Sequence, residues 1–385
     1  MPVSVSLANL LIVFIVILWI MSGNYQKKYN EIRSSKLMIS SIFFYLIHVI
    51  GMLWTEDLQW GFHILHKMWY FILLWPILFT LVKKEYIRYY LYSFFAALAI
   101  TEVISYLVWF EIIGDFMKAS PSHPTPFMSH ISFNPFLAFG IYLLLYELLI
   151  RKGINKVKFW SYSLLSIVMI FNMFITGGRA GQVMFFAVIT ILCFQFFRGN
   201  KIKGFITALI LVPGIFFIAY QTSPLFHERA NLAFDEIATY DKNMVASHQI
   251  VISSVGARIL FTANSWELIK NNPFIGVGTG DFPKEYKKIN AIHSPSGPFV
   301  TNPHNMFILV TTELGLLGLL SMLSILYFQV RISREQSNLF FQDVGFALPV
   351  LFLIIMWSDS YLLGHFTCLL FVFFSSFLHK DFEKH

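Results

Sequence analysis

Long apolar stretches alternate with short polar gaps along most of this chain. Each stretch runs for about 20 residues with few or no charges, the length that an α-helix needs to cross the hydrocarbon core of a membrane. We expect about eleven such helices, at residues 5–22, 37–54, 62–82, 86–110, 131–150, 159–177, 180–198, 204–222, 305–330, 343–362 and 365–379. The pattern predicts an all-α polytopic membrane protein of about 11–12 transmembrane helices.

Residues 223–303 break this rhythm, because they are polar and form a gap far longer than any other. A loop of that length is usually functional or disordered. Apolar residues recur at helical spacing within it, at Ile259, Ala263, Trp266 and Ile269, and Pro273 ends the pattern. We therefore predict a folded loop domain containing helices at 223–303, with helices one to eight before it in 1–222 and helices nine to eleven after it in 304–385.

Composition and charge agree with a membrane protein and orient it. Hydrophobic residues make up 57% of the chain and charged residues 13%, which excludes an ordinary soluble protein. Lysines and arginines gather in alternate gaps, at 27–36, 83–88, 151–158, 198–203, 331–334 and 380–384. The positive-inside rule makes these gaps cytoplasmic and places the 223–303 loop outside. The first stretch lacks a basic leader and a cleavage signal, so we expect a retained helix rather than a signal peptide.

Several function classes are disfavoured by the same residues. The sequence pI of about 9.2 could suggest nucleic acid, but most of the 28 lysines and arginines orient helices instead of forming one basic face. Cys193 and Cys368 lie near opposite membrane faces, so neither a disulfide nor a cysteine metal site is expected. Gly276, Gly278 and Gly280 resemble a nucleotide loop only superficially, because no βαβ unit surrounds them. We expect no metal, no cofactor and no nucleic-acid partner.

Three external residues carry candidate chemistry. Arg179 is a cation in a short gap where the topology predicts none, Arg258 would stand in the first turn of the loop helix, and His304 lies where the chain re-enters the membrane. A guanidinium is a planar fork of donors that suits phosphate oxygens. An imidazole can take a proton from a hydroxyl near neutral pH. Together these groups suit glycosyl transfer from a lipid diphosphate.

Plainer interpretations stand beside these. Arg179 could cap the preceding helix or snorkel to lipid headgroups, Arg258 could be a solvated charge, and His304 could be a turn residue. Lys67 lies about a turn and a half inside the third span, where an ionisable group is either a diphosphate contact or a snorkelling one. Asp359, at the external end of the tenth span, is either a supporting site residue or half of a helix-end pair.

Four motifs follow one another between Ile175 and Gly318. They are Ile175-Thr176-Gly177-Gly178-Arg179-Ala180, Ser253-Ser254-Val255-Gly256-Ala257-Arg258, Asn272-Pro273-Phe274-Ile275-Gly276-Val277-Gly278-Thr279-Gly280, and Pro303-His304-Asn305 followed by Glu313-Leu314-Gly315-Leu316-Leu317-Gly318. In this order they resemble the O-antigen ligase superfamily, which contains O-antigen ligases, O-antigen polymerases and bacterial protein O-oligosaccharyltransferases. The resemblance covers about residues 160–330, and the first 150 residues match only in hydropathy.

The resemblance implies a GT-C-like membrane fold and a metal-independent inverting glycosyltransferase in the bacterial inner membrane, with its active site facing the periplasm. The donor would be a glycan on undecaprenyl diphosphate and the acceptor a hydroxyl of lipid A-core. By this analogy Arg179 and Arg258 bind the diphosphate, with Lys67 as a further contact, and His304 activates the acceptor. Similar ligases carry a Ser-Asp pair where this chain has Ser358-Asp359.

Within the superfamily, an O-antigen ligase is the favoured prediction. The chain is short and has one large external loop, whereas a polymerase more often has two and a protein O-oligosaccharyltransferase is usually longer at its carboxyl end. A polytopic transporter is the non-enzyme alternative, but the chain lacks the repeats and broken helices of many transporters. The family usually has twelve spans with both ends cytoplasmic, so either a first helix is missing here or two spans are merged.

Overall fold

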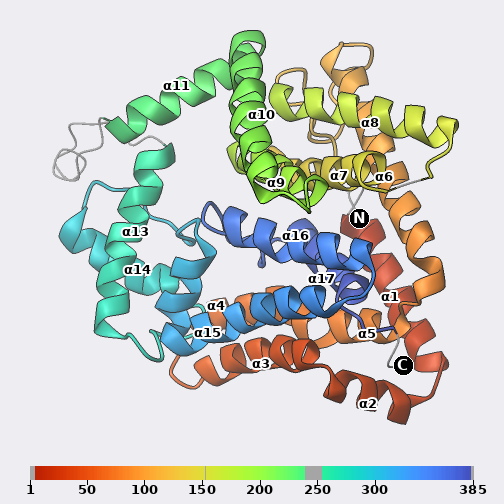
Figure 1. Cartoon of the computed structure of the whole chain (residues 1–385). Helices are drawn as coiled ribbons and strands as arrows, with labels where there is room; N and C mark the ends of the chain where they lie inside the picture. The colour runs from red at the N-terminus through yellow and green to blue at the C-terminus, as the bar shows by residue number, and fades with distance from the viewer. Residues whose placement is uncertain (1–4, 152, 239–253, 383–385) are drawn as a thin grey trace. The chain divides into compact units, whose positions relative to one another are not determined.

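A computed structural model describes residues 5–151, 153–238 and 254–382 as a nearly all-helical chain (Figure 1). Lys152, Ser253 and Lys384, which belong to patterns used above, lie outside these residues. Within them, extended pairing is limited to isolated bridges from Phe116 to Ala119 and from Ser120 to His123. The predicted fold class is confirmed: this is an all-α polytopic membrane protein.

The chain divides into two compact units, which are described one at a time. Unit 1 consists of Met1–Phe14, Lys83–Asn231 and Ser337–Leu351. Unit 2 consists of Ile15–Val82, Leu232–Gln336 and Phe352–His385. Three helices contribute to both units, namely α1 (Val5–Met21), α11 (Pro224–Ala238) and α16 (Leu339–Ile355).

Unit 1 is built around α7 (His130–Leu149), whose residues from Phe133 to Leu144 are buried on every side. Small residues let its neighbours approach: a side chain on Gly140 would collide with Leu98 and Met169. The outer helices of the unit are apolar but exposed, because they face lipid rather than water. The remaining elements are η2 (Lys84–Tyr86), α6 (Ile87–Trp109), α8 (Lys156–Ile175), α9 (Arg179–Phe196) and α10 (Lys201–Thr222).

Unit 2 pairs α15 (Met306–Glu335) with α3 (Lys36–Gly51). Two helices from the 223–303 segment, α13 (Ser254–Asn271) and α14 (Phe282–His293), pack on the first turns of α15 through an aromatic core. The predicted helix around Trp266 is confirmed, and it ends before Pro273 as expected. The other elements are α2 (Tyr25–Ser34), α4 (Leu58–Trp69), the π-helix η1 (Tyr70–Leu74), α5 (Trp75–Leu81) and α17 (His365–Leu378).

The predicted span at 305–330 is not one continuous helix. Gly315 has a φ of 61° and a ψ of −156°, so the helical hydrogen-bond ladder is broken there. The preceding loop replaces the lost bonds. Leu316 N and Leu317 N donate to the Pro273 and Phe274 carbonyls at 2.8 and 3.3 Å, and the Thr312 and Glu313 carbonyls accept from Val277 N and Gly278 N, each at 2.9 Å. We name this exchange of backbone bonds the loop lock.

Every predicted apolar span contains a helix, but their lengths differ. Seven are long and apolar enough to cross a membrane among the residues described, at Leu58–Leu81, Lys84–Trp109, His130–Leu149, Lys156–Ile175, Arg179–Phe196, Lys201–Thr222 and Met306–Glu335. An eighth candidate, Val5–Met21 with Tyr25–Ser34, bends by 113°. The helices α3, α16 and α17 have 16, 17 and 14 residues. At 1.5 Å per residue these three are shorter than a hydrocarbon core of about 30 Å.

Each unit has one end at which cations pair with polar side chains. In unit 1, Lys158 Nζ donates to the Tyr92 hydroxyl at 2.7 Å, and Arg198 pairs with Asp343. In unit 2, Lys380 Nζ lies 2.6 Å from the Glu31 carboxylate. The helix directions put the start of α9 at the other end of unit 1, and the start of α15 at the other end of unit 2. These two helix starts carry the candidate chemistry.

Candidate functional site

The chain turns sharply at His304 before α15 begins. His304 has a φ of 53°, a left-handed conformation that costs a residue with a side chain on the order of 1–2 kcal/mol. The turn is held from both sides: His304 N donates to Asn302 Oδ1 at 2.9 Å, and Asn305 Oδ1 caps the helix by accepting from Phe307 N at 3.0 Å. Backbone strain of this kind clusters at functional sites.

A carboxylate faces the imidazole of His304. Asp359 Oδ1 lies 3.2 Å from His304 Nδ1, and it also accepts from Ser360 N at 2.7 Å. Asp359 belongs to the turn after α16 rather than to the end of a span. Because a carboxylate can only accept, it favours the tautomer with the proton on Nδ1 and the lone pair on Nε2. The His304 side chain is 40% exposed, so a hydroxyl can reach it.

Arg258 lies in the same neighbourhood of unit 2. Helix α13 begins at Ser254, so Arg258 starts its second turn rather than standing in the first. Phe261, one turn further on, brings its ring to 6.3 Å from the His304 ring. Burial and the Asp359 carboxylate raise the pKa of Tyr361, whereas the Arg258 guanidinium lowers it. Both charges therefore act on the Tyr361 hydroxyl, and the half-buried Arg258 lies one turn before the phenylalanine whose ring faces His304.

The loop lock continues into contacts that fix α14 and, with it, the packing of α13. Asp281 accepts from the backbone N–H groups of Glu56 and Asp57, each at 2.8 Å. Lys284 Nζ lies 2.8 Å from Glu56, and this hydrogen bond and its charge lower the pKa of the Glu56 carboxyl. These contacts fasten α14 to the turn between α3 and α4, and the positive φ angles of Gly276, Gly278 and Gly280 shape the chain that leads into it.

Arg179 begins α9 in unit 1, after a glycine turn that buried polar groups hold. Asn134 Nδ2 donates to the Gly178 carbonyl at 3.3 Å, and Thr176 Oγ1 donates to Asn134 Oδ1 at 2.9 Å. Gln182 Nε2 donates back to the Met173 carbonyl at 3.2 Å. The Arg179 side chain is half-buried. These hydrogen bonds fix the backbone at the amino terminus of the helix where Arg179 stands, an end that already favours anions.

A second guanidinium stands at this turn. Arg229 Nη2 lies 3.4 Å from where a Cβ on Gly177 would be, so the Arg229 guanidinium packs against this glycine. Sequence reasoning missed Arg229, because it lies in the polar loop among other charges and no motif contains it. Asn134 was missed too, because its partners Thr176 and Gly178 lie more than 40 residues away in the sequence.

Four other residues have described positions. Lys67 is half-buried in α4, which begins at Leu58, and it lies about 13 Å along the helix from that start. Glu102 receives the Asn172 amide at 2.9 Å, an interhelical polar contact. Cys193 and Cys368 are buried free thiols. Among the residues with described positions, no group of three or more His, Cys, Asp or Glu is arranged to hold a metal ion.

Comparison with known families fits this geometry. Residues 164–323 match the family model described as O-antigen ligase. No curated protein matches the chain. The matched range includes Arg179, Arg258, His304 and the loop lock, and it excludes Lys67 and Asp359. The chain is therefore a multi-pass membrane protein whose residues 164–323 are similar to the O-antigen ligase family, and this match supports membership of the O-antigen ligase and polymerase superfamily.

Proposed function

We propose that this protein is an O-antigen ligase. It transfers a glycan from undecaprenyl diphosphate to a hydroxyl of lipid A-core, at the periplasmic face of the bacterial inner membrane. The observation that carries the proposal is the His304 and Asp359 pair, 3.2 Å apart, with Arg258 on the same helix as the Phe261 ring that faces His304. A base held in one tautomer next to a permanent cation is what transfer from a diphosphate requires.

In the proposed reaction, His304 Nε2 removes the proton from the acceptor hydroxyl. The hydroxyl oxygen attacks the anomeric carbon as the bond from that carbon to the diphosphate oxygen breaks. A single displacement inverts the anomeric configuration, and undecaprenyl diphosphate leaves with the bonding electron pair. Asp359 keeps the proton on Nδ1 and stabilises the imidazolium that forms.

The leaving diphosphate gains negative charge, so it needs fixed cations. Arg258 can supply a bidentate fork in unit 2, since a guanidinium keeps its charge and matches phosphate oxygens. In unit 1, Arg179 is proposed to bind phosphate as well, and Arg229 at the same turn adds a second guanidinium to that role. Lys67 is the weaker candidate, because its depth in α4 suits a lipid-linked substrate and snorkelling alike.

The acceptor separates a ligase from a polymerase, which the family match does not distinguish. Deleting a ligase leaves long glycans on undecaprenyl diphosphate while lipid A-core stays bare. Deleting a polymerase instead leaves lipid A-core carrying one repeat. We expect bare lipid A-core on a silver-stained gel of a deletion strain, restored by the parent gene. Core plus one repeat would overturn the ligase assignment.

Metal independence is part of the proposal and has its own test. The guanidinium groups are proposed to stabilise the leaving diphosphate without an ion. Transfer by the reconstituted protein should therefore survive EDTA. A strict requirement for added magnesium or manganese would contradict this mechanism.

A further inference from the structure

A cavity of about 640 Å³ lies in unit 1, at the cationic end. The first turns of α6, the last turns of α7 and the start of α16 form its walls. Tyr146 of the wall and Asn134 of the Arg179 turn are at opposite ends of α7, about 18 Å apart along the helix. The cavity is therefore separate from the candidate site, and nothing in the proposed reaction uses it.

The charged groups in the wall leave a positive excess. Lys84 and Arg88 are four residues apart, so they share one face, and both are exposed. In the part of the chain that is described, neither forms an ion pair. The wall also contains Glu147, but Arg151 Nη1 donates to both of its carboxylate oxygens at 2.7 Å. Two cations thus remain for an anionic ligand.

The rest of the wall is apolar. Ile87 and Leu91 are buried on α6, one turn apart, and Phe341 is buried on the facing α16. A ligand that fills this space would place a charged group against Lys84 and a hydrocarbon segment against Leu91. Such a ligand is an amphiphile with an anionic head.

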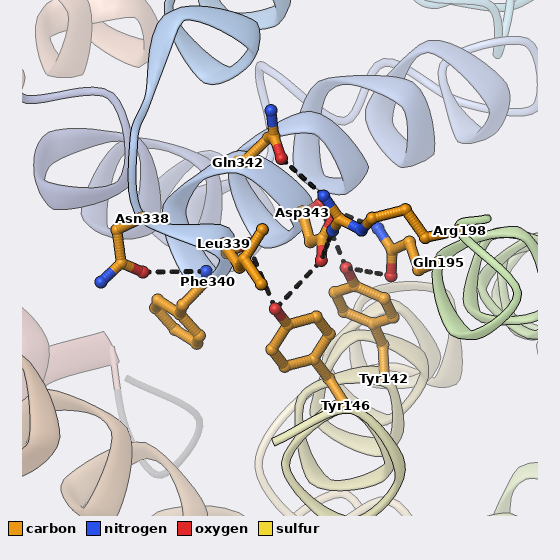
Figure 2. A network of polar contacts seen from close by, with 9 residues as sticks. All are labelled: Tyr142, Tyr146, Gln195, Arg198, Asn338, Leu339, Phe340, Gln342 and Asp343. Carbon is orange, nitrogen blue, oxygen red and sulfur yellow. Dashed lines mark hydrogen bonds and ion pairs between the residues drawn. The ribbon is translucent and has the colours of Figure 1, made fainter. Parts of the chain in front are cut away.

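One wall is fixed before any ligand binds. Figure 2 shows the Tyr146 hydroxyl pointing at Asp343, which also pairs with Arg198. The Tyr146 to Asp343 Oδ2 distance is 3.0 Å, and Asn338 Oδ1 accepts from Phe340 N at 2.9 Å where α16 begins. A preformed wall lowers the entropy that binding must overcome.

We propose that this cavity binds the phosphodiester headgroup of an anionic glycerophospholipid. Lys84 and Arg88 hold the phosphate, and an acyl chain runs along Leu91 and Phe341. The cationic end of unit 1 is the end that the positive-inside rule assigns to the cytoplasmic leaflet, where headgroups surround the helix ends. Basic pockets between helices at that level suit anionic lipids.

The test measures retained lipid. Full-length protein is placed in bilayers of phosphatidylglycerol diluted in phosphatidylcholine, released, and weighed by native mass spectrometry. We expect one phosphatidylglycerol to be retained by the parent, and binding about 30-fold weaker in Lys84→Gln with Arg88→Gln, since each cation near a headgroup contributes about one factor of five. Lys201→Gln with Lys203→Gln removes two exposed cations from the same end outside the cavity and should leave retention unchanged.

A second variant keeps the charges and fills the space. Ile150→Trp enlarges a half-buried residue in the cavity wall and should also abolish retention, with unchanged thermal unfolding as the folding control. Equal retention by the parent and the double variant would overturn the proposal. Release of the lipid by millimolar inorganic phosphate would also overturn it, because the cavity would then be a site for free anions.

Discussion

The turn at Arg179, where α9 begins, and the turn at His304, where α15 begins, are held by different kinds of residues. The Arg179 turn is glycine-rich and held by buried side-chain amides, with Gly181 packed directly against Asn134. The His304 turn is strained, exposed at its ring, and held by two asparagines and one carboxylate. A guanidinium never changes its charge, so it needs only position. An imidazole that moves a proton needs a fixed tautomer and access to substrate.

The largest loss of glycosyl transfer is expected when His304, the proposed base, is replaced. His304→Ala should reduce transfer by about 10²–10⁴-fold, because a general base contributes that much, and donor binding should persist. Turnover and donor binding are measured on protein in liposomes. His293→Ala removes an exposed histidine of α14 as the matched control. Loss of donor binding together with turnover would mean that His304 holds substrate instead.

The two arginines proposed to bind the diphosphate should tolerate no change of their planar fork geometry. Arg179→Lys and Arg258→Lys should each lose about 10²-fold in transfer, since a single ammonium cannot bind two phosphate oxygens at once. Arg331→Lys is the control, because Arg331 forms an exposed pair with Glu335. Full activity in Arg258→Lys would return that residue to the solvated-charge interpretation.

Asp359→Asn tests the orienting partner of His304. An amide can present an N–H to Nδ1 and favour the wrong tautomer, so we expect a loss of about 10–100-fold, smaller than for removal of the base. The acceptor KM should stay constant while kcat falls. An unchanged kcat would show that Asp359 does not orient the imidazole.

Packing supports the Arg179 turn, and Gly181→Ala should disturb it. The new Cβ would lie 2.1 Å from Asn134 Cβ and 2.7 Å from its carbonyl carbon, so backbone has to shift. We expect a destabilisation of about 1–3 kcal/mol with reduced transfer. Gly214→Ala in α10 meets nothing within 4 Å and should be tolerated. Equal thermal unfolding of the two variants would contradict the packing account.

The smallest effect is expected on the unfolding temperature, from the ion pair of Glu56 and Lys284. The pKa of Glu56 is lowered from 4.5 by this pair, so its stabilising contribution is present above pH 4.5 and is lost as the pH falls through the folded value. The Glu56 carboxyl is fully exposed, so the contribution of this ion pair to stability should be small. Glu56→Gln should unfold slightly earlier than the parent at pH 7, and the difference should disappear near pH 3.

The sequence predicted the features that depend on local pattern. Apolar runs gave the helices, and the isolated Arg179 and the Pro303-His304-Asn305 run gave candidate residues. The contacts of Asn134 and Arg229 were not predictable, because they join segments far apart in the chain. The break at Gly315 was hidden as well, since hydropathy averages over a window in which one glycine among leucines changes little.

The loop lock has a consequence for how the protein is made. Residues Pro273 to Gly278 leave the ribosome about 40 residues before Leu317, which is roughly 2–8 s at ordinary rates of synthesis. Without these residues the backbone N–H and C=O groups around the break at Gly315 in α15 have no hydrogen-bond partners. An unpaired backbone group is costly in lipid. The first half of this helix therefore completes its fold only after the Pro273–Gly278 run has reached it, so packing of the last helices waits on this loop.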